Sequence, residues 1–248
     1  TINPDLTKDN VFSLRSGGST AGNAAFGTAV EVDGVRLSTN ASLGDPTGAS
    51  TRNLSATNIE SVEVVTGVPS AEYGDISSGV VKISTRKGKT PYTLVLSTNP
   101  RTKQISASKG FDPGTDRGVL NSSVEYTRAM KNPTSPYSSY SRTGIALNYQ
   151  NTFAKVLRFN FGVTANIGGM NTEDDPDAQV GEWEKVRDNA LRANTSLKWL
   201  LNKPWITCVD FDASLSYADK LARRHTYQSS ATETPAVHAE SEGYYIAE

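Results

Sequence analysis

The stretch NLSATNIESVEVVTGVPSAEYGDISSGVVKISTRKGK, Asn53–Lys89, decides the fold of this chain. Two of its segments, Ser61–Thr66 and Gly79–Thr85, are rich in valine and isoleucine, which predicts β-strands because these side chains suit a pleated, half-buried surface. Gly67–Ser78 joins them, and its proline, glycines and small polar residues are typical of a turn-rich connector. Asn53–Glu60 predicts a short helix or turn that its first residue could cap.

Fourteen positions of this stretch resemble the end of the plug domain of TonB-dependent outer-membrane transporters, where the same pattern closes the plug and leads into the barrel. They are Ile59, Glu60, Val62, Glu63, Val64, Gly67, Ser70, Tyr73, Gly74, Gly79, Val80, Ile83, Thr85 and Gly88. The family's Gly-Pro dipeptide is split here by Val68. Two more pieces occur in the family's order: Val30–Leu37 (VEVDGVRL) resembles a plug strand and turn, and Ser13–Gly18 (SLRSGG) resembles an arginine-containing plug segment.

This resemblance implies a mainly β protein with two parts. A small mixed α/β plug domain would occupy residues 1–89, and residues 90–248 would form the first long antiparallel strands of a transmembrane β-barrel. The family's barrel is roughly 22-stranded. The plug-motif residues are Arg15, Asp33, Gly34, Glu60, Glu63, Gly67, Tyr73, Gly74 and Gly79. Arg15, Glu60 and Glu63 either pair with barrel charges to hold the plug or are ordinary surface charges.

Composition excludes several other classes of protein. The 25 basic and 26 acidic residues give a net charge of −1, so no nucleic-acid footprint is implied. The mean hydropathy is −0.44, and no apolar run approaches the roughly 20 residues of a spanning helix, although alternating membrane strands also give a polar average. Cys208 is the only cysteine, so no intrachain disulfide is possible. Thr1 begins directly in polar sequence without a signal peptide, as we expect when an upstream part is missing.

After Pro91 the pattern changes to long alternating runs. Leu157–Gly168 alternates apolar with polar or small residues over all 12 positions, and Leu191–Trp199 and Trp205–Tyr217 repeat the pattern. Shorter or noisier strands are predicted at Tyr92–Ser97, Gln104–Lys109, Val119–Arg128 and Ile145–Tyr149. The three long runs reach the roughly nine to eleven residues of a tilted membrane strand, whereas soluble strands usually have about five or six.

The ends and connectors of these runs also favour a barrel over a soluble β-sandwich. Aromatic residues at run ends fit interfacial girdles: Tyr149, Trp199, Trp205 and Tyr217. Short turns at Asn151–Lys155 and Asn202–Pro204 alternate with long polar connectors at Lys131–Tyr140, Met170–Asp188 and Lys220–Glu248. About six or seven strands are predicted, too few to close around a plug, so we expect a fragment whose last connector is an outer loop cut short.

Chemistry-bearing motifs are scarce, and the sequence predicts no catalytic residue, metal site or cofactor. The two histidines, His225 and His238, lack metal-ligand spacing, and Glu173–Asp177 (EDDPD) lacks the glycine and glutamate spacing of an EF-hand. The resemblance instead implies apical plug loops that contact an external ligand, Ala21–Phe26 and Ser38–Arg52. The candidate ligand-facing residues in them are Asn23, Phe26, Asn40, Asp45 and Arg52.

The predicted function is therefore gated active import of a nutrient across the bacterial outer membrane. By resemblance, a TonB–ExbB–ExbD complex supplies the energy and outer-membrane lipid surrounds the barrel. The ligand stays open among siderophore, haem, vitamin, glycan and peptide. The plug sequence looks most like Bacteroidetes-type receptors, which often act with a surface lipoprotein. Two alternatives remain: a secreted soluble β-sheet adhesin or glycan-binding module, and an enzyme on a β scaffold.

Overall fold

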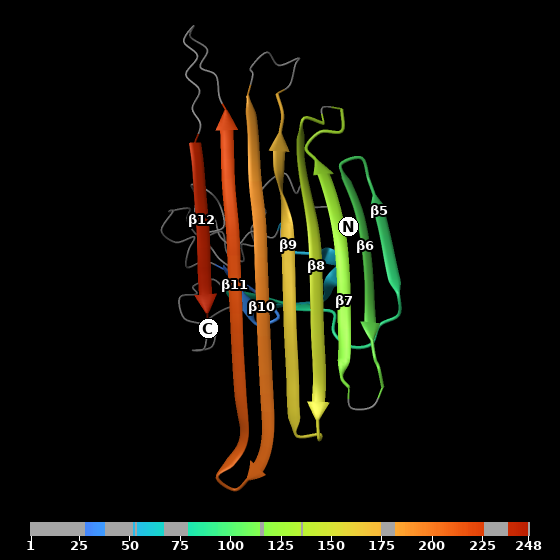
Figure 1. Ribbon diagram of the computed structural model, residues 1–248, viewed down its shortest axis with the longest axis vertical. Helices are drawn as coiled ribbons and strands as arrows, with labels where there is room; N and C mark the ends of the chain where they lie inside the picture. Colours follow the sequence, from blue (N-terminus) through green and yellow to red (C-terminus); the bar gives the residue numbers. More distant parts are fainter. Residues whose placement is uncertain are drawn as a thin grey trace.

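The chain forms two β-sheets that lie one behind the other (Figure 1). The computed structural model describes residues 28–37, 52, 54–66, 79–114, 117–134, 136–174, 182–225 and, for the backbone alone, 238–247. Here the small domain means the four-stranded sheet with order β2-β1-β4-β3, together with its connecting residues. The large sheet means the eight-stranded sheet with order β12-β11-β10-β9-β8-β7-β6-β5.

The small domain is built around a parallel pair of strands. Its elements are β1 (Thr28–Val32), β2 (Val35–Arg36), the 3-10 helix η1 (Ala56–Asn58), β3 (Ile59–Val65) and β4 (Gly79–Thr85). β1 runs parallel to β4, and β2 and β3 pair antiparallel on either side. Its core is an apolar cluster in which Val30, Val81 and Ile83 are at most 2% exposed. Burial of such side chains is the main force that holds a domain this small together.

The predicted turn and strands of this domain are confirmed. β4 has the predicted bounds, and β1 and β2 flank the predicted turn. Asp33 and Gly34 have φ angles of 52° and 83°, the left-handed pair that a tight hairpin turn requires. The region before β3 differs in detail, because only Ala56–Asn58 is helical and Ser55 makes no side-chain cap. Gly67–Ser78 lies outside the described residues.

The large sheet is an antiparallel meander in which every strand pairs with its neighbours in sequence. Its strands are β5 (Thr93–Thr98), β6 (Thr102–Phe111), β7 (Val119–Met130), β8 (Ser138–Phe153), β9 (Leu157–Thr172), β10 (Trp183–Lys203), β11 (Ile206–His225) and β12 (His238–Ala247). β8 turns tightly into β9, and β10 into β11, at the same end of the sheet, which we call the short-turn end (lower end in Figure 1). The opposite end, where β7–β8, β9–β10 and β11–β12 connect, is the long-loop end.

Two sequence predictions about the large sheet are wrong. The strands extend beyond their apolar runs, so that β10 has 21 residues and much of the predicted connector Met170–Asp188 is strand. The final segment is not a single loop, because β12 returns along β11 as an eighth strand. Strand pairing depends on backbone hydrogen bonds, and these continue where apolar alternation has stopped. The β12 sequence HAESEGYYIA has no such alternation.

The large sheet has its apolar face outward and its polar face toward the small domain. On β9 and β11, Phe161, Ile167 and Phe211 are 43%, 60% and 57% exposed. On the opposite face, Asn166 and Arg142 are only 2% and 3% exposed. The small domain lies behind this polar face (Figure 1). A water-soluble domain buries its apolar face instead. The exposed apolar face of this sheet therefore suits an apolar environment, such as lipid, on the side away from the small domain. Trp199 and Trp205 at the short-turn end are 47% and 83% exposed. Among the described residues, helices long and apolar enough to span a membrane are absent.

Candidate functional site: the interface between the small domain and the large sheet

A buried ion pair on the large sheet is the first contact that fixes the small domain. Glu125 on β7 and Arg142 on β8 form a salt bridge, and both side chains are 3% exposed. The two strands pair directly, and alternation directs both side chains to the inner face. A buried pair of opposite charges is stable only when its remaining hydrogen-bonding groups are also satisfied. The small domain supplies those partners.

The segment around Ser55 wraps over this ion pair. Arg142 donates hydrogen bonds to the carbonyl oxygens of Arg52 and Leu54, the latter at 3.0 Å. The Glu125 carboxylate accepts from the hydroxyl of Ser55 and, at 2.7 Å, from that of Thr57. Gln104 on β6 adds a further donor at 2.9 Å from its Nε2 to the Glu125 Oε2. Ser55 therefore directs its hydroxyl to the large sheet rather than capping the helix that follows it.

The turn at Asp33 provides a second contact. Its carboxylate accepts hydrogen bonds from the Thr85 backbone N–H at 3.1 Å and the Thr85 hydroxyl at 2.5 Å, and lies 3.0 Å from Lys87 Nζ. These bonds tie the turn to the end of β4. The large sheet reaches the same place, because Asn194 Nδ2 donates to the Asp33 carbonyl at 3.1 Å and Asn148 Nδ2 donates to the Thr85 hydroxyl at 3.2 Å.

The linker between β4 and β5, residues 86–92, contacts β6 and β7. Asn121 Nδ2 donates to the Gly88 carbonyl at 3.3 Å and lies 3.2 Å from the Thr90 hydroxyl. Gly110 leaves room for this path, because an added Cβ would lie 2.2 Å from the Gly88 carbonyl oxygen and 2.4 Å from the Thr90 nitrogen. A side chain at position 110 would therefore displace the linker.

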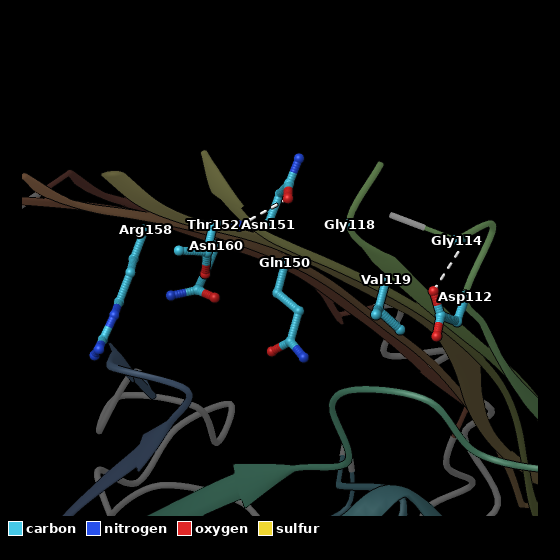
Figure 2. A pocket seen from close by; sticks show the side chains of 9 residues that line it. All are labelled: Asp112, Gly114, Gly118, Val119, Gln150, Asn151, Thr152, Arg158 and Asn160. Atoms are coloured by element: carbon cyan, nitrogen blue, oxygen red, sulfur yellow. Dashed lines mark hydrogen bonds between the residues drawn. The ribbon is translucent and has the colours of Figure 1, made fainter. Parts of the chain in front are cut away.

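A polar cavity of about 560 Å³ lies on the inner face of the large sheet, at its short-turn end. Gln150, Arg158 and Asn160 point from the large sheet into it, toward the strands of the small domain (Figure 2). Asp112, which directly follows β6 on the same sheet, also lines it. The lining can exchange hydrogen bonds with water or with a polar solute. Among the described residues, no group of three histidine, cysteine or acidic side chains could hold a metal ion.

The predicted plug-motif residues fall into three groups. Asp33 and Gly34 form the turn described above, and Gly79 begins β4 with a φ of 125°. Glu60 and Glu63 lie exposed on β3, and among the described residues neither has an ion-pair partner. Four residues lie outside the described part of the chain: Arg15, Gly67, Tyr73 and Gly74.

The predicted ligand-facing residues are mostly outside the described part too, namely Asn23, Phe26, Asn40 and Asp45. The exception is Arg52, which is 7% exposed and lies with its guanidinium 5.5 Å from the centre of the Tyr140 ring. Arg52 therefore packs against Tyr140 of β8 at the interface, and its side chain does not face the outside. Sequence reasoning missed Glu125 and Arg142, whose charges in alternating strands were the available clue.

Comparison with known proteins gives a family match for the first part of the chain and similar folds among solved structures. The family model described as TonB-dependent Receptor Plug Domain matches residues 4–81. The structure of the siderophore receptor PiuA from Acinetobacter baumannii is similar with a TM-score of 0.59 and 16% identity, over 79% of this chain and 30% of that chain. The siderophore receptor PirA from the same organism has a TM-score of 0.50 and 14% identity, over 83% of this chain and 39% of that chain. No curated protein matches in sequence.

The small domain is thus a plug, and the large sheet is a barrel wall with its apolar face toward lipid. Residues 4–81 match the plug domain of TonB-dependent receptors, proteins of the bacterial outer membrane, and the fold of the chain is similar to part of the siderophore receptor PiuA. It spans 30% and 39% of the lengths of the two receptors named above.

Proposed function

We propose that this chain is the gating part of a TonB-dependent importer, in which the plug blocks the barrel until it is moved. One observation carries the proposal: apolar contacts hold the plug together internally, whereas hydrogen bonds join it to the wall. The plug has its own apolar core, in which Val30 and Val81 are fully buried, whereas its described bonds to the wall are polar. Polar groups that separate can bond to water instead, so the plug can leave the wall without exposing its core.

The cavity on the inner face of the wall supports the same function. It lies at the short-turn end, which is the periplasmic end in barrels of this kind, and its lining is polar. A hydrophilic solute released from the plug would meet hydrogen-bonding groups there. A TonB–ExbB–ExbD complex supplies the pull in this proposal. A surface lipoprotein partner of the Bacteroidetes type is its least supported element, since it depends on sequence resemblance alone.

The ligand class is open, and a ferric siderophore is the first to test. Both solved structures described above are named siderophore receptors. Haem, vitamin B12, glycans and peptides follow in the same uptake panel.

The test is to fasten the plug to the wall. The full-length receptor would first receive Cys208→Ser, because Cys208 is the only cysteine in this chain. Thr85→Cys with Asn148→Cys then places one thiol on the plug and one on the wall, at side chains now 3.2 Å apart. A short cleavable bis-thiol cross-linker should abolish uptake of labelled ligand from the panel, and cleavage should restore it.

A matched control links two positions within the wall. Ser123 and Ala146 are directly paired on β7 and β8 and face the same interior, so Ser123→Cys with Ala146→Cys should leave uptake unchanged. Uptake that continues while the plug is fastened would refute plug-gated import. A receptor that is water-soluble, with no change in gel migration on boiling, would instead favour the soluble β-sheet alternative.

A further inference from the structure

Three inward positions of the wall form a row in which a glycine lies between two asparagines. Asn148 on β8 pairs directly with Gly162 on β9, and Gly162 pairs directly with Asn194 on β10. Cβ atoms at directly opposed positions of neighbouring strands are about 4.5–5.5 Å apart, so both asparagine side chains lie beside the space over the glycine. Both also contact the plug, since Asn148 donates to the Thr85 hydroxyl and Asn194 to the Asp33 carbonyl.

The plug determines which end of each amide faces it. The Thr85 hydroxyl donates its only proton to the Asp33 carboxylate at 2.5 Å, so it can only accept from Asn148. The Asp33 carbonyl is an acceptor as well. Both asparagines must therefore turn their NH2 groups to the plug, and their Oδ1 atoms then lie close to Gly162.

Gly162 leaves the space that this orientation needs. A Cβ added at position 162 would lie 2.7 Å from Asn148 Oδ1 and closer still to Asn194 Oδ1, whereas ordinary contacts begin at 3.4 Å. The three atoms nearest to this Cβ all belong to the two asparagine side chains and none to the backbone of the wall. An alanine would therefore fit if both amides turned away, and both bonds to the plug would then break.

Space, rather than backbone conformation, is what requires a glycine here. Gly162 is buried in the middle of β9, and its φ angle is not positive. Residues with a side chain adopt such a conformation without strain. The missing side chain of Gly162 is thus explained by its two neighbours in the row.

We propose that Gly162 is a positioning residue for plug retention, which holds the amides of Asn148 and Asn194 in the orientation that binds the plug. It acts through these two neighbours and sets how readily the Asp33 turn and the end of β4 leave the wall. The inference rests on the proposed function, because retention matters for import only when the plug moves.

Hydrogen exchange of the full-length receptor in detergent tests this role. The reporters are the backbone amides of Asp33 and Thr85, which bond to the Ile83 carbonyl and to the Asp33 carboxylate. Two hydrogen bonds of ordinary strength change an equilibrium constant about 5- to 150-fold. Gly162→Ala should therefore speed exchange of both amides by about that factor. The assay needs no ligand and no energy source, so a failed import assay would leave its result intact.

Two comparisons separate positioning from a general effect on the strand. In a variant with Asn148→Ala and Asn194→Ala both amides are gone, so adding Gly162→Ala should change the exchange of the reporters no further. Gly144→Ala is the matched control on the neighbouring strand, because its added Cβ would meet the side chain of Asn166 instead. It should leave the reporters unchanged.

Unchanged exchange of the reporters in Gly162→Ala would overturn the proposal. So would faster exchange in the triple variant than in the double asparagine variant, since the glycine would then serve the strand itself. Where Gly162→Ala alone does not give a barrel whose gel migration shifts on boiling, the triple variant should give one, because it has room for the methyl group. Failure of the triple variant to fold, beside a folded double variant, would overturn the proposal as well.

Discussion

Replacing Glu125 by alanine should loosen the plug far more than removing an exposed charge. The variant leaves the Arg142 guanidinium, which is 3% exposed, without its carboxylate. Removing one partner of a buried ion pair costs about 3–5 kcal/mol. The hydroxyls of Ser55 and Thr57 and the amide of Gln104 lose their acceptor as well.

The loss should be local, and hydrogen exchange can locate it. In the full-length receptor, the backbone amides of residues 54–58 should open more easily by about 3–5 kcal/mol, which is the cost of stranding the arginine. Amides in β9, which makes none of these bonds, should keep their protection. Combining Glu125→Ala with Arg142→Met should recover much of the loss, because two apolar side chains leave no stranded charge.

A matched control removes a carboxylate from an exposed pair. Asp210 lies 3.2 Å from Lys198, and their side chains are 46% and 47% exposed. Asp210→Ala should therefore cost only about 0–1 kcal/mol, as exposed pairs do. If Glu125→Ala changed protection at residues 54–58 no more than Asp210→Ala, the Glu125–Arg142 pair would not be what holds the plug segment, and the reasoning would fail.

Three further perturbations test other parts of the structure. Phe161→Arg should destabilise the folded barrel by about 2–4 kcal/mol in urea titrations in lipid, whereas Asn160→Ser on the opposite face should be mild; equal costs would contradict a lipid-facing β9. Gly110→Ala should lower the free energy of unfolding by about 1–3 kcal/mol, because the added methyl group overpacks against the linker backbone. Gly144→Ala should lower it less, because the atom 3.1 Å from its added Cβ belongs to a side chain. The melting temperatures of the two variants give the comparison. Asp33→Ala removes the acceptor of three donors and should speed proteolysis of the plug, and cleavage at the wild-type rate would show that the turn is held by other contacts.

The sequence predicted elements whose patterns are local. β4 was predicted residue for residue, and the Asp33–Gly34 turn and the long alternating runs were predicted because each depends on neighbouring residues. β12 was missed because its pairing with β11 uses backbone groups that leave no trace in side-chain alternation.

The interface was harder to predict because its partners are far apart in sequence. The bond between Ser55 and Glu125 spans 70 residues, and that between Arg142 and the Arg52 carbonyl spans 90. A charged residue at an inward strand position can face water, a ligand or the plug, and alternation alone does not choose among them. The burial of Arg52 was not predictable either, because Tyr140, the residue it packs against, belongs to a strand far away in the sequence.

The two-faced strands also divide the evolutionary constraints on this chain. Along β9, Phe161 and Ile167 face outward, whereas Asn166 faces the plug. Lipid accepts any apolar side chain of suitable size, so outward positions can drift among leucine, valine, isoleucine and phenylalanine without regard to their neighbours. Inward positions whose side chains bond to a plug side chain change only together with that partner. Among relatives, substitutions at wall position 125 should therefore be correlated with those at plug positions 55 and 57, and substitutions at wall position 148 with those at plug position 85, while the lipid face varies independently.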